Sequence, residues 1–85
     1  MREYDQNLQG YTNERLAHEI AKLRYDSIRD IIDNLSGELE KQAEEDLGKG
    51  RPMLHAEVTA AVRNLRNAVD SLNKAWNISR PHINH

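Results

Sequence analysis

The sequence predicts an all-α fold in which a two-helix antiparallel hairpin dimerises into a four-helix bundle. Two long segments carry apolar residues at helical spacing, and a short segment containing two glycines separates them. A connection this short forces the two helices to lie antiparallel. The 85 residues make one domain, 1–85, which is too small to bury a large core, and the chain has no cysteine for a disulfide.

The first predicted helix covers about residues 12–47. Thr12 or Asn13 is suited to cap its N-terminus, because either side chain accepts a hydrogen bond from a free backbone amide. Gly37 costs about 1 kcal/mol in a helix but faces away from the apolar stripe, so we expect one continuous helix. A break there, with Ser36 capping a second short helix, is the alternative. The stripe consists of Leu16, Ala17, Ile20, Ala21, Ile28, Ile31, Ile32, Leu35, Leu39 and Ala43.

The second predicted helix covers about residues 52–77 and follows a loop at 48–51. Gly48 is expected just past the end of the first helix, and Pro52 has the backbone angle favoured at a first helical position. Residues 78–85 are expected to form an extended tail, because a proline near the start of that segment ends helical continuation. The apolar stripe of the second helix consists of Leu54, Val58, Ala61, Val62, Leu65, Ala68, Val69, Leu72, Ala75 and Trp76.

The width of this second stripe predicts self-association. At 100° per residue the stripe is about 140° wide, which is more than one partner helix covers. Folding the hairpin places Leu35 beside Leu65, so Leu65 is predicted to be the most buried residue of its helix. The chain has only one other long apolar helix, so a second copy is expected to cover the rest. The predicted oligomer interface consists of Ile28, Ile32, Leu35, Leu39, Val58, Val62, Leu65, Val69, Leu72 and Trp76.

Arg24 is the only charged residue in the middle of the first stripe. The hairpin places it level with Trp76, the single tryptophan of the chain, so we expect the guanidinium to stack on the indole. The alternative is that Arg24 binds an anion or a carboxylate of a partner, because a guanidinium matches the geometry of both.

The sequence contains no recognisable catalytic constellation. It has no His-Glu-x-x-His pair, no glycine-rich phosphate loop and no paired cysteines, so we expect no catalytic residues, no metal and no cofactor. Glu14, His18, His82 and His85 could converge on a metal in the folded hairpin. Surface histidines without a function are the more common case, and two of these four lie in the expected tail.

Charge is distributed unevenly along the chain. Residues 1–47 contain six Lys or Arg and twelve Asp or Glu, a net charge of −6, whereas residues 48–85 contain six and two, a net charge of +4. The three basic residues on the outer face of the second helix are Arg63, Arg66 and Lys74, which could contact nucleic acid. An acidic first helix nearby would repel phosphate, which argues against that partner.

These observations favour a small non-enzymatic oligomeric adaptor or regulator that acts through protein–protein contacts. Its expected partners are itself, as a homodimer or higher oligomer, and another protein. A nucleic-acid-binding hairpin dimer and a helical-bundle enzyme with an anionic substrate at Arg24 are the two alternatives. The first ten residues are polar and no apolar run reaches transmembrane length, so a cytoplasmic protein with no membrane contact is expected.

Overall fold

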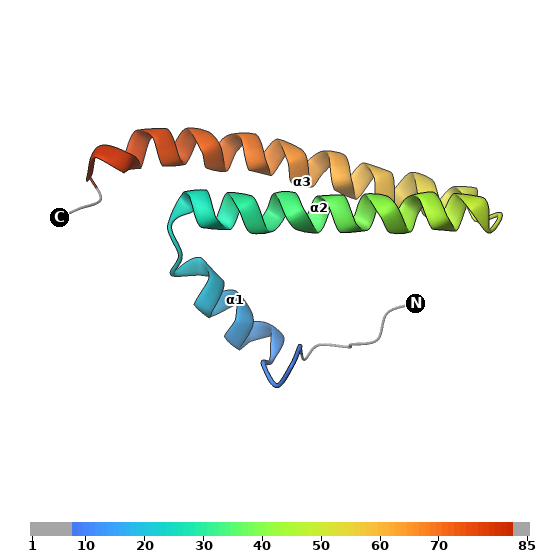
Figure 1. The fold of residues 1–85 in the computed structure, drawn as a ribbon, viewed down its shortest axis with the longest axis horizontal. Coiled ribbons are helices and arrows are strands. Elements are labelled where there is room, and N and C mark those ends of the chain that lie inside the picture. The colour runs from blue at the N-terminus through green and yellow to red at the C-terminus, as the bar shows by residue number, and fades with distance from the viewer. Residues whose placement is uncertain (1–7, 83–85) are drawn as a thin grey trace.

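The computed structural model describes residues 8–82 and is all-α. Three helices follow one another, α1 (Asn13–Ala21), α2 (Tyr25–Gly48) and α3 (Pro52–Ser79), and a 3₁₀ turn, η1 (Arg80–His82), closes the described chain. Figure 1 shows that α2 and α3 lie side by side as an antiparallel hairpin, whereas α1 bends away from the start of α2. The hairpin predicted from the sequence is therefore present within one chain.

The predicted continuous helix over 12–47 is wrong, because the chain breaks between α1 and α2. The amide of Leu23 donates to the carbonyl of Ile20 at 3.0 Å, which closes α1 with a tight turn. Arg24 is extended, with φ −62° and ψ 156°, and precedes the first residue of α2. The break lies level with Trp76, close to the end of α3. Beyond that level no helix packs against the first segment, and a helix without tertiary packing is marginal in water.

Gly37 does not interrupt the helix, as the phase of the stripe predicted. α2 runs without a break for 24 residues through this position. Thr12 is the N-cap of α1, and its hydroxyl accepts a hydrogen bond from the amide of Arg15 at 3.1 Å. Both predictions rest on local chemistry, and both are confirmed.

The turn between α2 and α3 differs in detail from the predicted one. Gly48 is the last helical residue, and Gly50 instead adopts the left-handed conformation, with φ +76°. Glycine enters this region without the clash that a Cβ would make. The amide of Arg51 donates to the carbonyl of Asp46 at 2.9 Å, which satisfies a free acceptor at the end of α2. Pro52 opens α3 as predicted.

The C-terminal segment is helical for longer than the sequence predicted. α3 continues to Ser79, and η1 extends through residue 82, so the extended tail is wrong for residues 78–82. The backbone amide of Arg80 bonds the carbonyl of Trp76. Helices commonly tighten into a 3₁₀ turn at their C-termini, and Pro81 lies within this one. The rest of the predicted tail, 83–85, lies outside the described residues.

Very little of the described chain is buried. Ala43 and Val62 are 2% and 5% exposed, and Ser36 is fully buried. Leu65, predicted to be the most buried residue of its helix, is only half-buried, and its expected neighbour Leu35 is 45% exposed. The prediction for Leu65 is wrong, because α2 packs on one edge of the stripe of α3 and not on its centre.

The described molecule is elongated and flat. Its extents are 52 × 29 × 13 Å and its radius of gyration is 15.5 Å. A compact domain of this length has a radius of gyration of about 12 Å. Within residues 8–82, α2 and α3 pack along their length, and α1 makes no comparable contact with either. None of the described helices is long and apolar enough to cross a membrane.

Candidate functional site

The apolar stripe of α3 divides into three rows of seven-residue spacing, and only the first row faces α2. This inner row consists of Val62, Val69 and Trp76, of which Val62 is buried. His55, seven residues before Val62, places its Nδ1 atom 2.9 Å from the carbonyl oxygen of Ala43 on α2. A middle row, Val58, Leu65 and Leu72, is half-buried. In the outer row, three of the four side chains are exposed. The outer row consists of Leu54, Ala61, Ala68 and Ala75.

α2 uses its apolar stripe in the same way. Ser36 and Ala43 lie against α3 and are buried. On the other flank of the stripe, Ile31 is 37% exposed and Leu35 is 45% exposed. In each helix, one edge of the apolar stripe therefore packs against the other helix of the hairpin, and the other edge is left uncovered.

The uncovered edges lie on the same side of the hairpin. On each helix the uncovered edge is about 80° from the line of contact, in the same rotational sense when each helix is viewed from its own N-terminus. The two helices are antiparallel, so equal rotations turn both edges toward one side. We call this surface the apolar face. It consists of Ile28, Ile31, Leu35 and Leu39 on α2 and Leu54, Ala61, Leu65, Ala68 and Leu72 on α3.

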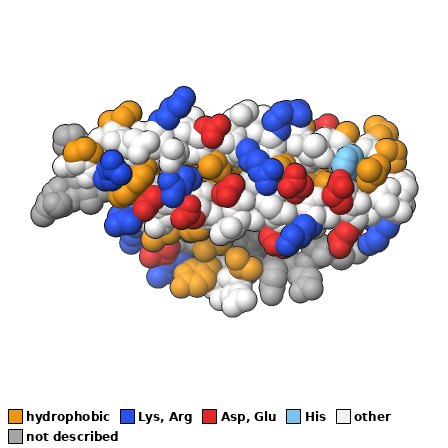
Figure 2. All heavy atoms as spheres, turned by 45° about the horizontal axis from the view of Figure 1, so that its top comes forward, with side chains coloured by type: hydrophobic (Ala, Val, Ile, Leu, Met, Phe, Trp, Pro, Cys, Tyr) orange, Lys and Arg blue, Asp and Glu red, His pale blue; other side chains and the backbone are white. Residues whose placement is uncertain are grey.

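The opposite side of the hairpin is charged. Arg66 of α3 reaches Glu40 of α2 at 3.3 Å, and Arg29 of α2 donates to Asn73 of α3 at 2.7 Å. Figure 2 shows Lys, Arg, Asp and Glu side chains spread over both helices, with hydrophobic side chains visible in the seam between them. These exposed pairs contribute little stability, because water screens them. This surface suits contact with solvent.

A shallow hollow lies on the charged side, near the turn. Its volume is 170 Å³, which is below the size of typical ligand pockets, about 300 Å³ or more. It is lined by Glu40, Ala43, Glu44, His55, Thr59 and Val62.

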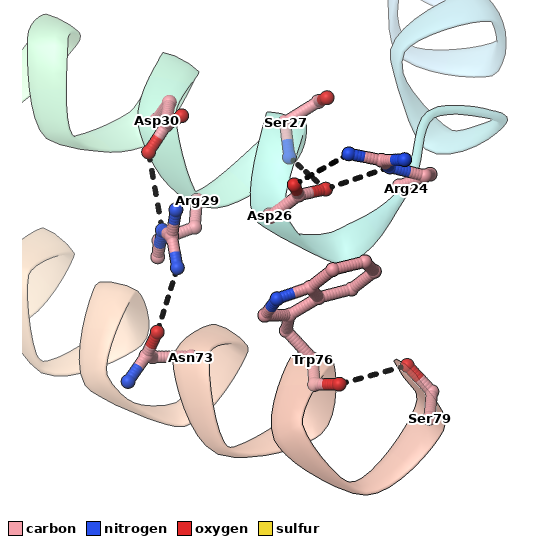
Figure 3. A network of polar contacts seen from close by, with 8 residues as sticks. All are labelled: Arg24, Asp26, Ser27, Arg29, Asp30, Asn73, Trp76 and Ser79. Carbon is pink, nitrogen blue, oxygen red and sulfur yellow. Dashed lines mark hydrogen bonds and ion pairs between the residues drawn. The ribbon is translucent and has the colours of Figure 1, made fainter. Parts of the chain in front are cut away.

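At the other end of the hairpin, Arg24 stacks on Trp76 as the sequence predicted. The guanidinium carbon lies 5.0 Å from the centroid of the indole ring. Figure 3 shows the second interaction of this group, in which Nε and Nη2 donate to the carboxylate of Asp26 at 3.1 and 2.8 Å. The Asp26 carboxylate also accepts from the amide of Ser27 at 2.9 Å. The interacting residues lie before or in the first turn of α2 and in the last turns of α3.

The Arg24–Asp26 pair shifts the pKa values of both groups. Hydrogen bonds from Arg24 lower the pKa of Asp26 below its ordinary value, and partial burial opposes this shift. The hydrogen bond to Asp26 raises the pKa of Arg24. The charge of Arg24 is thus balanced within the chain, which weighs against its use for an external anion.

The remaining candidates are dispersed. Glu14 and His18 are exposed on α1, and His85 lies outside the described residues. Among residues 8–82, no three His, Cys, Asp or Glu side chains are grouped for a metal ion. Of the three basic residues considered for nucleic acid, Arg66 is paired with Glu40.

Eight of the ten predicted interface residues are partly buried in the single chain. Leu35 is exposed, whereas Val62 is buried inside the hairpin and offers no surface to a second copy. Sequence reasoning missed Ser36, the most buried of the described residues. The signal was its seven-residue spacing from Ala43, since small residues let two helices approach closely.

Comparison with models of known protein families, with curated proteins and with solved structures finds no match.

Proposed function

We propose that the chain is a small non-enzymatic adaptor or regulator that acts through protein–protein contacts, the first of them with a second copy of itself. The observation that carries this proposal is the apolar face, which α2 and α3 form together. Leu35, at the centre of this face, is 45% exposed. Stable domains bury such a face against a second layer of structure. Two hairpins stacked on this face would make a four-helix bundle.

The geometry favours this function over the two alternatives. A nucleic-acid surface would need basic side chains free of carboxylates, but Arg66 is paired with Glu40 and α2 is strongly acidic. An enzyme with an anionic substrate at Arg24 would need an available guanidinium, but Asp26 accepts two hydrogen bonds from that group. The cytoplasmic location stays a prediction, which cell fractionation would test.

The test is a charge placed in the apolar face. We expect Leu35→Glu to shift the protein from dimer or larger species to monomer in sedimentation velocity at micromolar concentration. A carboxylate buried between two copies without a partner is strongly unfavourable. Asn34→Glu is the matched control, because it adds the same charge one residue away on the outer surface of α2, where the native residue is exposed.

The two variants together decide the proposal. Self-association that Asn34→Glu retains and Leu35→Glu loses supports the apolar face as the interface. A wild-type protein that sediments as a folded monomer would contradict the proposal. So would a Leu35→Glu variant that associates as tightly as the wild type.

A further inference from the structure

We propose that the two copies stack with their α2–α3 turns at the same end, so that each α2 lies against the α3 of the partner. This inference rests on the self-association proposed above and assigns its geometry. Two face-to-face arrangements with twofold symmetry are available to the hairpin. In one the turns lie together and unlike helices stack, and in the other the turns lie at opposite ends and like helices stack.

The charges of the two helices favour the stacking of unlike helices. α2 contains eight acidic and two basic residues, a net charge of −6. α3 contains two acidic and three basic residues, a net charge of +1. Stacking like helices would place two helices, each with a net charge of −6, about 10 Å apart. That spacing is close to the Debye length at physiological salt, so the repulsion is weakened but not removed.

The polar residues of α2 favour the same arrangement. Gln42 and Asp46 continue the uncovered edge of α2 toward the turn, and Asp46 pairs with Arg51 at 3.5 Å. With the turns together, these polar groups of both copies gather at one end of the bundle, where water enters. With the turns apart, Asp46 would lie near the apolar side of the first turns of the partner's α2. Taking a charged group out of water is unfavourable even when the group is paired.

Distances between identical spin labels distinguish the two arrangements. The chain has no cysteine, so Met53→Cys and Ile78→Cys each introduce a single labelling position. These side chains are 84% and 73% exposed and mark the two ends of α3, about 38 Å apart along the helix axis. Pulsed electron paramagnetic resonance on each labelled homodimer then reports the distance between the two identical labels, one on each copy. Sedimentation of each labelled variant verifies that it associates as the unlabelled protein does.

We expect both variants to give a distance near the width of a four-helix bundle. Distances near or above the helix length in both variants would overturn the arrangement and leave self-association standing. Mixing the two single-label variants provides the converse reading, because the mixed dimers add a long distance when the turns lie together and a short distance when the turns lie apart. Labelled protein that shows no distance between copies and sediments as a monomer would contradict both this inference and the proposed function.

Discussion

Arg24 uses two different surfaces of one side chain. Its planar face lies on the indole of Trp76, and its edge donates two hydrogen bonds to Asp26. A guanidinium can do both at once because its donors lie in the plane and leave the faces free. The contact therefore joins the start of α2 to the end of α3 at the level where the chain bends into α1.

The stacking contact predicts a measurable coupling between Arg24 and Trp76. We expect Arg24→Met and Trp76→Leu to show a favourable interaction energy in a double-mutant cycle, measured by urea unfolding. The cycle is needed because each single substitution also changes packing or the ion pair with Asp26. A double variant whose destabilisation equals the sum of the single effects would show that the contact contributes nothing.

The lowered pKa of Asp26 predicts a dependence of stability on acid. A carboxyl with a lower pKa in the folded protein than in the unfolded chain stabilises the fold at pH values above its ordinary pKa of 3.8. That stabilisation is lost as the pH falls through the lower pKa of the folded state. We expect Asp26→Asn to unfold more easily than wild type at neutral pH, with the difference shrinking in acid.

Asp33→Asn is the control for this experiment, because Asp33 is an exposed carboxylate on the same helix. We expect the free energy of unfolding of this variant to vary with pH as that of the wild type does. A constant difference between Asp26→Asn and wild type from neutral pH into acid would contradict the role assigned to Asp26.

At the scale of the helices, Ser36 sets how closely α2 approaches α3. It is fully buried, and its hydroxyl donates to the carbonyl of Ile32 at 2.8 Å. We expect Ser36→Leu to destabilise the hairpin by about 1–3 kcal/mol in urea unfolding, because a larger side chain forces the helices apart. Ser36→Ala should have only a small effect, since it removes a hydroxyl whose bond stays within its own helix. Equal unfolding midpoints for wild type and Ser36→Leu would contradict the close packing.

The isolation of α1 predicts low local stability. It has nine residues, and packing on α2 or α3 within residues 8–82 does not hold it in place. Helices of this length are marginal in water, even with a cap such as Thr12. We expect the amides of α1 to exchange with solvent much faster than those of the central turns of α2, as measured by hydrogen-exchange mass spectrometry. Equal protection in both helices would show that another surface covers α1.

The sequence predicted the elements where local chemistry decides them. The cap at Thr12, the continuity through Gly37, the start of α3 at Pro52 and the level of Arg24 with Trp76 all follow from residue type and spacing. The break before α2 could not be predicted in this way. It depends on where α3 ends, which is a property of the folded hairpin and not of residues 22–24.

The sequence also predicted which residues belong to the two apolar stripes. It did not predict which of them pack within the hairpin and which remain uncovered. A stripe wider than one contact can pack on either edge or at its centre, and periodicity does not choose among them. Contact at the centre of the α3 stripe would make Leu65 the most buried residue of the helix, whereas contact at one edge buries Val62. The same choice of edge places most of the middle and outer rows of α3 on the apolar face.

At the scale of the whole molecule, burial within one chain is too small for comfortable stability. Three described residues are buried, whereas a domain of 85 residues must offset the conformational entropy of every ordered residue. An association that requires the folded hairpin would stabilise it, so the proposed self-association makes folding depend on protein concentration.

This low burial has a consequence for the lifetime of the protein in a cell. Proteases cleave chains that open often, and a hairpin with an uncovered face opens often when it stands alone. We expect dilute protein to be digested by thermolysin much faster per molecule than concentrated protein, at a fixed protease concentration and with substrate kept subsaturating. A digestion rate per molecule that does not vary with concentration would contradict this. If the expectation holds, copies made in excess of what can assemble are removed, and the abundance of the protein regulates itself.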